Sequence, residues 1–254
     1  MLEANKKDRQ NIVTLSYNLR AKMVNVLGLS TDCNDCSRCL HRYGKGMKKK
    51  DFINAIKNGA ILPICIICYA IKYMLASPNA RKAYHYNSEV LKKRLLSDSE
   101  LKAIAHEIVS ALRKNKTHKF RLESFGDLSN EIQTLNYLRL CSFIKKEKRN
   151  YRIQIGLWTK NYDILIRAWE KLEKDHQNNC RKILSVILSS VFVEVRINQK
   201  IVDRVSNILG TPVKTFTVEI EETEKTNCGA KCCDTCGICY NAFNGIQDIF
   251  EVCR

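Results

Sequence analysis

Closely spaced cysteines are the residues of this chain best suited to chemistry. The chain has 13 cysteines, and ten of them fall in the groups Cys33-x2-Cys36-x2-Cys39, Cys65-x2-Cys68 and Cys228-x3-Cys232-Cys233-x2-Cys236-x2-Cys239. Thiolates two residues apart can bind one metal ion or cluster, because a short turn directs both sulfur atoms to one side. Grouped cysteines in a basic chain without an export signal indicate metal chemistry rather than disulfide bonds.

The tail group is the strongest of the three metal signals. It holds five thiols with few apolar neighbours, and Gly229 and Gly237 supply the tight turns that cluster loops need. Such spacing suits a 4Fe–4S cluster or a four-cysteine zinc site, and it does not distinguish them. The tail ligands we expect are Cys233, Cys236 and Cys239.

The two other groups allow more than one interpretation. Cys33, Cys36 and Cys39 could supply three ligands to a second site, or form a local zinc knuckle with His41. Cys65 and Cys68 precede an expected helix over 69–75, whose free amides would favour thiolate. This pair could bind metal, act as a redox dithiol, or be two buried thiols.

Three further candidate residues follow predicted strands. Gly126 and Asp127 come directly after one strand, and Lys160 follows the next. A glycine lets a ligand approach the backbone, and a carboxylate can hold an ammonium or hydroxyl group. Lys160 could hold an anion or pair with Asp127. The alternatives are a turn with an aspartate helix cap for Asp127 and a solvated loop lysine for Lys160.

The elements that must position these residues form a repeat. Alternating apolar residues predict strands over 118–124, 152–158, 183–189 and 213–220, with helices over 131–148, 162–175 and 198–209 between them. A strand-helix unit of about 30 residues with a right-handed crossover implies a parallel sheet with helices outside. Residues 11–18 and 23–27 are candidates for additional strands. We therefore expect an α/β open or partial barrel, with ligands at the carboxyl ends of the strands.

The flanking regions complete the expected organisation. Residues 80–117 are predicted to be helical, and Ser97-Asp98-Ser99-Glu100 forms a capping box. The chain divides into three segments. They are an N-terminal segment with the first cysteine group (1–59), an α/β core (60–222) and a cysteine-rich, metal-binding tail (223–254).

Charge and hydropathy limit the classes of partner. The net charge is +17, and residues 42–119 hold 17 Lys/Arg against 5 Asp/Glu, so +12 of the excess lies there. This basic region could contact nucleic-acid phosphates, or it could be a solvated helix face. The apolar stretch 60–76 is too short for the roughly 20 residues of a membrane span. No apolar signal segment follows Met1, so we expect a cytoplasmic protein that does not bind membranes.

Four of these motifs, in order, resemble those of the phage-associated gene product 88 family. They are Ile64-Cys-Ile-Ile-Cys-Tyr-Ala70, Arg121-Leu-Glu-Ser-Phe-Gly-Asp127, Leu157-Trp-Thr-Lys-Asn161 and Cys233-Asp-Thr-Cys-Gly-Ile-Cys239. The resemblance covers roughly residues 60 to 240. That family in turn resembles the radical S-adenosylmethionine enzymes. In those enzymes a three-cysteine loop after the first strand holds a 4Fe–4S cluster, and a glycine-acid motif after the second strand holds the methionine amine.

The resemblance implies a cluster held by Cys65 and Cys68, with Gly126 and Asp127 on the amine-binding rim. The spacings of three and two residues in the usual three-cysteine loop are absent, so a third ligand would come from Cys33–Cys39 or from the tail. We expect an iron–sulfur protein in which Cys65 and Cys68 share a site with Cys233, Cys236 and Cys239. If it is an enzyme, Asp127 and Lys160 would hold S-adenosylmethionine. The alternative is a zinc-stabilised nucleic-acid-binding protein without catalysis.

Overall fold

A single open sheet organises the protein. The computed structural model describes residues 12–17, 26–32, 47–67, 77–123, 126–147, 152–228 and 233–252. In these ranges the sheet has seven strands in sequential order: β1 (Ser16–Tyr17), β2 (Leu27–Leu29), β3 (Lys119–Leu122), β4 (Gln154–Thr159), β5 (Leu184–Ser189), β6 (Lys214–Glu219) and β7 (Asp248–Val252). β1 is antiparallel to β2, and β2 to β7 run parallel. The predicted α/β fold with an open parallel sheet is confirmed.

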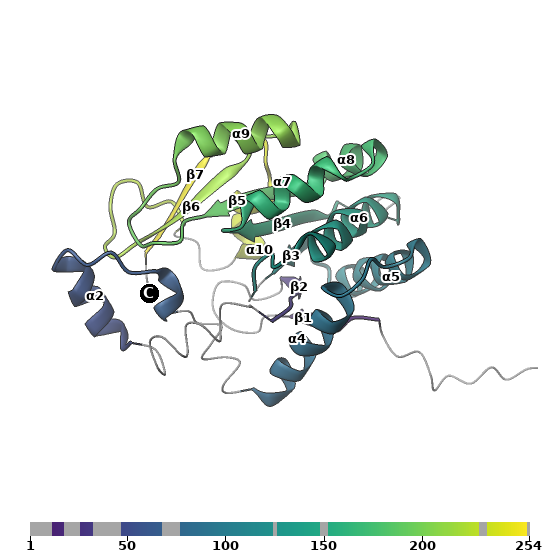
Figure 1. Ribbon diagram of the computed structural model, residues 1–254, viewed down its shortest axis with the longest axis horizontal. Helices are drawn as coiled ribbons and strands as arrows, with labels where there is room; N and C mark the ends of the chain where they lie inside the picture. The colour runs from purple at the N-terminus through teal and green to yellow at the C-terminus, as the bar shows by residue number, and fades with distance from the viewer. Residues whose placement is uncertain are drawn as a thin grey trace, which may run out of the picture.

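Helices join the strands and cover one face of this sheet (Figure 1). The helices on this face are α4 (Pro78–Leu91), α5 (Asp98–Lys114), α6 (Glu131–Glu147), α7 (Tyr162–Glu170), α8 (Lys174–Arg181) and α9 (Gln199–Leu209). The other helical elements are α2 (Lys49–Lys57), the short α10 (Cys233–Cys236) and the 3-10 turns η2 (Ile64–Ile67) and η3 (Ile238–Tyr240). The capping box at Ser97 and Glu100 starts α5 as predicted. Gly210, with φ of 64°, ends α9.

Side-chain alternation divides the sheet into a helix-covered face and an opposite face. On β4, Ile155 and Leu157 are buried in the main core against the helices. Trp158 points to the other face and packs with Ile187 of β5 and Ile249 of β7 in a second cluster. Successive strand residues point to opposite faces, so the central strands β4 and β5 contribute side chains to both clusters. The second face is therefore a packed surface as well.

Several boundaries differ from the sequence-based expectation. The helical region 80–117 is two helices, α4 and α5, and the predicted helix over 162–175 is also two, α7 and α8. The fifth parallel pairing, between β6 and β7, was not predicted. β1 and β2 belong to the segment 1–59, and β7 belongs to 223–254. All three predicted segments therefore contribute strands to one sheet.

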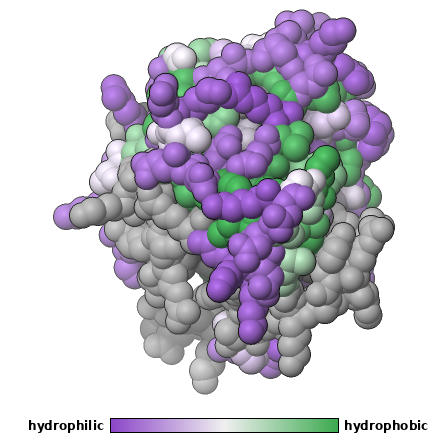
Figure 2. Space-filling view, turned by 90° about the vertical axis from the view of Figure 1, so that its left-hand side faces the viewer, coloured by the Kyte–Doolittle hydropathy of each residue, from purple (hydrophilic) through white to green (hydrophobic). Residues whose placement is uncertain are grey.

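The apolar stretch 60–76 is described only as far as residue 67. Ile66 is buried there, whereas Ile61 is 72% exposed. Among the described residues, no helix combines the length and apolar character needed to cross a membrane. Figure 2 shows the side of the molecule on which α2 lies, with hydrophobic side chains exposed between hydrophilic ones.

Candidate functional site

The carboxyl end of β2 leads directly into the first cysteine group. Thr31 and Asp32 are the last described residues before Cys33. The Thr31 amide donates a hydrogen bond to Glu123 Oε2 at 3.2 Å, and its hydroxyl donates to Glu123 Oε1 at 2.8 Å. Cys33, Cys36 and Cys39 themselves lie outside the described residues. The segment that carries them thus starts from a residue tied to the end of the neighbouring strand β3.

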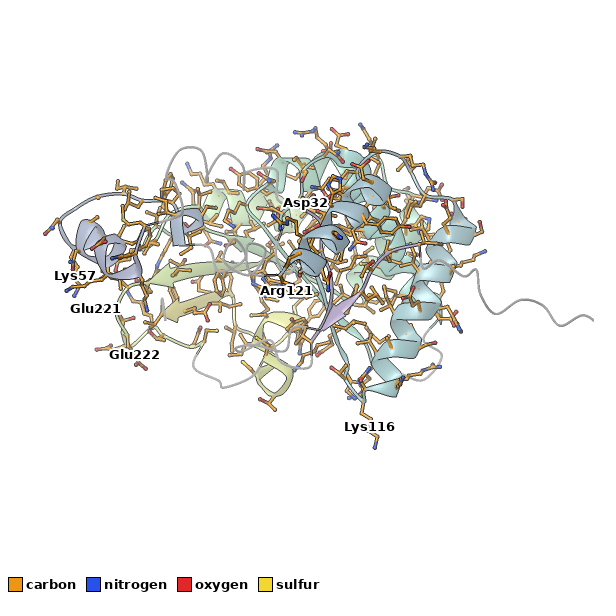
Figure 3. All side chains as sticks on the ribbon, turned by 90° about the horizontal axis from the view of Figure 1, so that it is seen from below. Asp32, Lys57, Lys116, Arg121, Glu221 and Glu222 are labelled. Carbon is orange, nitrogen blue, oxygen red and sulfur yellow. The ribbon has the colours of Figure 1, made fainter. Side chains whose placement is uncertain are left out.

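Asp32 is held by one face of α4. Its amide donates to Ser88 Oγ at 2.8 Å, and Lys92 Nζ donates to its carbonyl oxygen. His85 Nδ1 lies 3.1 Å from its carboxylate oxygen Oδ2. These three helix residues follow at intervals of three and four, the spacing of one helix face. Figure 3 labels Asp32 near the middle of the molecule.

Glu123 is a buried carboxyl group at the end of β3. Its φ of 54° is in the left-handed region, which few non-glycine residues adopt. Besides both Thr31 groups, Gln133 Nε2 donates to its Oε1 at 2.6 Å, and the Tyr137 hydroxyl donates to the same oxygen. Burial raises the pKa of Glu123 to about 7, and the hydrogen bonds from Tyr137 and Thr31 oppose the rise. Glu123 therefore links β2, β3 and α6 through its hydrogen bonds. We call the group of Thr31, Glu123, Gln133 and Tyr137 the strand-end joint.

Gly126 makes room for that carboxyl group. A Cβ atom at Gly126 would lie 2.1 Å from Glu123 Oε2 and 2.8 Å from the Thr31 carbonyl oxygen. Contacts below 3.0 Å are essentially never seen for real Cβ atoms. The glycine is therefore required by packing within the protein. That Gly126 also lies beside the amine of a ligand stays a prediction.

Asp127 binds the end of the next strand, β4, through its side chain. Its Oδ1 accepts from the Thr159 hydroxyl at 2.6 Å and from the Leu128 amide at 2.8 Å. The Lys160 amide donates to Oδ2 at 3.1 Å. Burial raises the pKa of Asp127, and the Lys160 charge opposes the rise. The backbone of Lys160 is thus held next to Asp127, and a pairing of the two side chains stays a prediction.

Cys65 lies at the same edge of the sheet as Thr31. It is in η2, where the Ile64 amide donates to the Val191 carbonyl, just beyond the end of β5. Pro63 forms a bridge with Phe192, and Ile64 packs beside Val218 near the end of β6. Cys68 lies outside the described residues, three positions along the chain.

The tail cysteines lie elsewhere, on the face opposite the helices. Cys228, Cys233 and Cys239 pack against the cluster of Trp158 and Tyr240. Lys119, the first residue of β3, donates to the Cys233 carbonyl at 2.9 Å. Burial raises the pKa of Cys239 to about 12, and the neighbouring thiols Cys228, Cys233 and Cys236 raise it further, whereas Arg121 opposes them.

Cations anchor this tail to the sheet. Lys214, the first residue of β6, donates to Asn244 Oδ1 at 2.6 Å and to the Ile246 carbonyl. The Arg121 guanidinium lies 3.8 Å from the centre of the Trp158 ring. Lys119 and Lys214 thus hold the tail from the first residues of β3 and β6, whereas Cys65 and Thr31 lie beyond strand ends. A site shared by Cys65 with Cys233, Cys236 and Cys239 stays a prediction.

No three His, Cys, Asp or Glu side chains in the described part of the chain are arranged to hold a metal ion. That part omits four of the eight predicted ligands, Cys33, Cys36, Cys39 and Cys68. The four that it contains are divided between the edge at Cys65 and the tail. The metal ligands, and the single site shared by Cys65 and the tail, therefore remain predictions.

Several cations of the basic region 42–119 are already engaged within the protein. Lys57 pairs with Glu221, as Figure 3 shows at one end of the molecule. Lys93 pairs with Glu89, and Arg94 pairs with Glu100. Lys119 is buried and holds the tail. This reduces the charge that is free to contact phosphate.

The residues that build the strand-end joint carry little signal in the sequence. Thr31, Glu123, Gln133 and Tyr137 were not singled out as candidates. Their signal was present in part, since Glu123 lies in the quoted motif Arg121–Asp127. An acidic residue after a strand is ordinarily exposed, and only the positive φ of Glu123 turns it into the core.

One comparison with known proteins gives a match. A family model described as Gene product 88 matches residues 2–242. No curated protein and no solved structure matches the chain.

Proposed function

This chain belongs to the Gene product 88 family, and we propose that it binds an iron–sulfur cluster at the carboxyl ends of its parallel strands. The ligands would come from Cys33, Cys36 and Cys39 together with Cys65 and Cys68. The tail cysteines would not take part.

One observation carries the proposal. β2 is the first strand of the parallel sheet, and Thr31 and Asp32 connect it to Cys33 without any intervening element. Thr31 is bonded to Glu123, which ends the second parallel strand. A three-cysteine segment and an acidic segment therefore leave neighbouring strands at the same edge. Ligands bind at this edge in parallel α/β folds.

The position of Cys65 supports the same edge. Its neighbour Ile64 is bonded to Val191, two residues after β5 ends. Thiolates are suitable ligands for iron–sulfur clusters, which need up to four of them. The two groups supply five thiols without the tail, so the donor set fits a cluster.

The arrangement agrees with the resemblance to radical S-adenosylmethionine enzymes in order along the chain. The three-cysteine group follows the first parallel strand, and the glycine-acid motif follows the second. The group has spacings of two and two residues, where the usual loop has three and two. A bound cluster would supply one electron to a sulfonium ligand such as S-adenosylmethionine. Lys160, beside Asp127 at the next strand end, is the cation available to an anionic group of that ligand.

Anaerobic purification followed by iron, sulfide and zinc analysis tests this proposal. We expect about four irons and four sulfides per chain for one 4Fe–4S cluster, and a brown protein with broad visible absorbance. A colourless protein with stoichiometric zinc and no sulfide would contradict it.

The alternative of a zinc-stabilised nucleic-acid-binding protein has one supporting observation. Lys48, Lys49 and Lys50 lie at the start of α2, and Lys48 and Lys50 are exposed. This alternative requires binding of DNA or RNA that weakens steeply as salt is raised. A fluorescence titration with labelled single- and double-stranded oligonucleotides at low salt measures it. Unchanged fluorescence at micromolar protein would exclude this function.

A further inference from the structure

The joint at Glu123 has a consequence for the cysteine segment that starts two residues after Thr31. We infer that Glu123 is a positioning residue, which fixes the end of β2 through Thr31 and so sets where the following cysteines leave the sheet. The inference rests on the proposed cluster site for its functional meaning. The joint itself consists entirely of described residues.

The Glu123 carboxyl group accepts hydrogen bonds from two groups of Thr31. One carboxyl oxygen accepts from the Thr31 amide and the other from the Thr31 hydroxyl, at 3.2 and 2.8 Å. The Glu123 amide in turn donates to the Leu29 carbonyl at 3.0 Å. The end of β2 is thus bonded through both backbone and side chain to the end of β3.

The carboxyl group is itself held in place. Gln133 donates to Oε1 of Glu123 at 2.6 Å and to the Thr31 hydroxyl oxygen at 3.1 Å. Tyr137, one helical turn later on α6, donates to the same Oε1. Glu123 and Tyr137 are both fully enclosed, with 1% and 0% of their surfaces exposed. Two side chains of a rigid helix therefore fix the acceptor that fixes Thr31.

A second set of contacts holds the next residue from the other side. Ser88 accepts a hydrogen bond from the Asp32 amide at 2.8 Å, and Lys92 donates to the Asp32 carbonyl oxygen. Successive Cα atoms are about 3.8 Å apart, so Cys33 starts within that distance of a residue held by α4. The backbone that enters the cysteine group is therefore held at Thr31 from α6 and at Asp32 from α4.

This arrangement explains why an acidic residue occupies a buried position. A buried carboxyl group costs stability unless its oxygens are satisfied, and here an apolar side chain at 123 would leave the buried donors of Thr31, Gln133 and Tyr137 without an acceptor. When it is ionised, the carboxyl group provides two acceptor atoms in one plane, which is what simultaneous binding of the Thr31 amide and hydroxyl needs. A glutamine provides only one acceptor, so one of these bonds is lost.

The test uses Glu123→Gln and Thr31→Val in the full chain, with Asn136→Ala as the matched control. Asn136 is also fully buried on α6, and it bonds to the backbone of Leu91, Arg94 and Leu96. Its loss therefore removes comparable hydrogen bonds on the same helix without touching Thr31. Thermal denaturation of all three variants verifies that they are folded.

Two readouts are measured on each variant. The first is the iron and sulfide content after anaerobic purification, with the electron paramagnetic resonance spectrum of the reduced cluster. The second is the rate at which iodoacetamide alkylates Cys33 in metal-free protein, followed by peptide mass spectrometry. We expect both joint variants to lose at least half of the iron and to alkylate about tenfold faster, the factor that corresponds to about 1.4 kcal/mol. The Asn136 control keeps wild-type values.

The outcomes separate this inference from the proposed function. If wild-type protein binds no iron but Cys33 alkylation still rises in both joint variants, the positioning role stands and the cluster proposal fails. If wild-type protein binds iron and the joint variants keep full iron and wild-type alkylation rates, Glu123 has no positioning role. Equal changes in the Asn136 control would also overturn the inference, because they would show a general loss of stability.

Discussion

Replacing Gly126 with alanine tests the packing of the strand-end joint most sharply. The added Cβ would lie 2.1 Å from Glu123 Oε2, so that oxygen has to move by at least 3.0 − 2.1 = 0.9 Å to reach the shortest contact that real Cβ atoms show. The Thr31 carbonyl, at 2.8 Å, blocks movement on another side. The bond from the Thr31 amide to the same oxygen, already 3.2 Å long, does not survive such a shift.

The size of the effect follows from two contributions. Overpacking a buried site costs about 1–3 kcal/mol, and the lost hydrogen bond adds about 1 kcal/mol. The free energy of unfolding should therefore fall by about 2–4 kcal/mol. For a chain of this length that corresponds to a decrease of about 4–16 °C in melting temperature.

Differential scanning calorimetry of Gly126→Ala beside Gly59→Ala measures this. Gly59 has a φ of 86° and nothing within 4 Å of its Cβ position, so alanine there costs only the backbone strain, about 1 kcal/mol. A Gly126→Ala protein that melts within about 2 °C of wild type would refute the close packing of Gly126 on Glu123.

Two further predictions concern buried charges. Burial raises the pKa of Glu123 to about 7, against about 4.3 for an unfolded glutamate. The folded state therefore keeps a proton that the unfolded state releases, and the unfolding free energy should fall by up to about 3 kcal/mol as pH rises from about 4.5 to 7. Urea denaturation should show that Glu123→Gln lacks this slope; an identical slope in the variant would contradict it. Burial lowers the pKa of Lys214, which holds the tail at Asn244 and Ile246. We expect Lys214→Met to speed trypsin cleavage after Lys225, because the tail loses this contact. The control Lys200→Met, at an exposed position, should leave the cleavage rate unchanged. Equal cleavage rates in the two variants would contradict the role of Lys214 in holding the tail.

The strand and helix repeat was predictable because each unit carries its own local signal. Apolar alternation located β3 to β6, and the capping box located the start of α5. β7 was missed because Asp248–Val252 is a single short strand that follows a cysteine-rich segment rather than a helix. Its pairing with β6 depends on the chain crossing the far face of the sheet, which no local pattern encodes.

The candidate site was predictable only in its position at the strand ends. The pairing of Asp127 with Lys160 could be proposed because each follows a strand. The role of Glu123 could not, because a positive φ and the arrival of α6 turn its side chain inward. The packing of the tail cysteines against Trp158 and Tyr240 also depends on which face the tail covers, and cysteine spacing contains no information on that.

The most direct test of the account compares one cysteine from each group. Iron and sulfide per chain are measured in anaerobically purified Cys36→Ser, Cys65→Ser and Cys236→Ser proteins beside wild type. The account predicts that the Cys36 and Cys65 variants lose the cluster, and that the Cys236 variant keeps wild-type iron. Loss of iron in the Cys236 variant alone would place the cluster in the tail and contradict the proposed site at the strand ends.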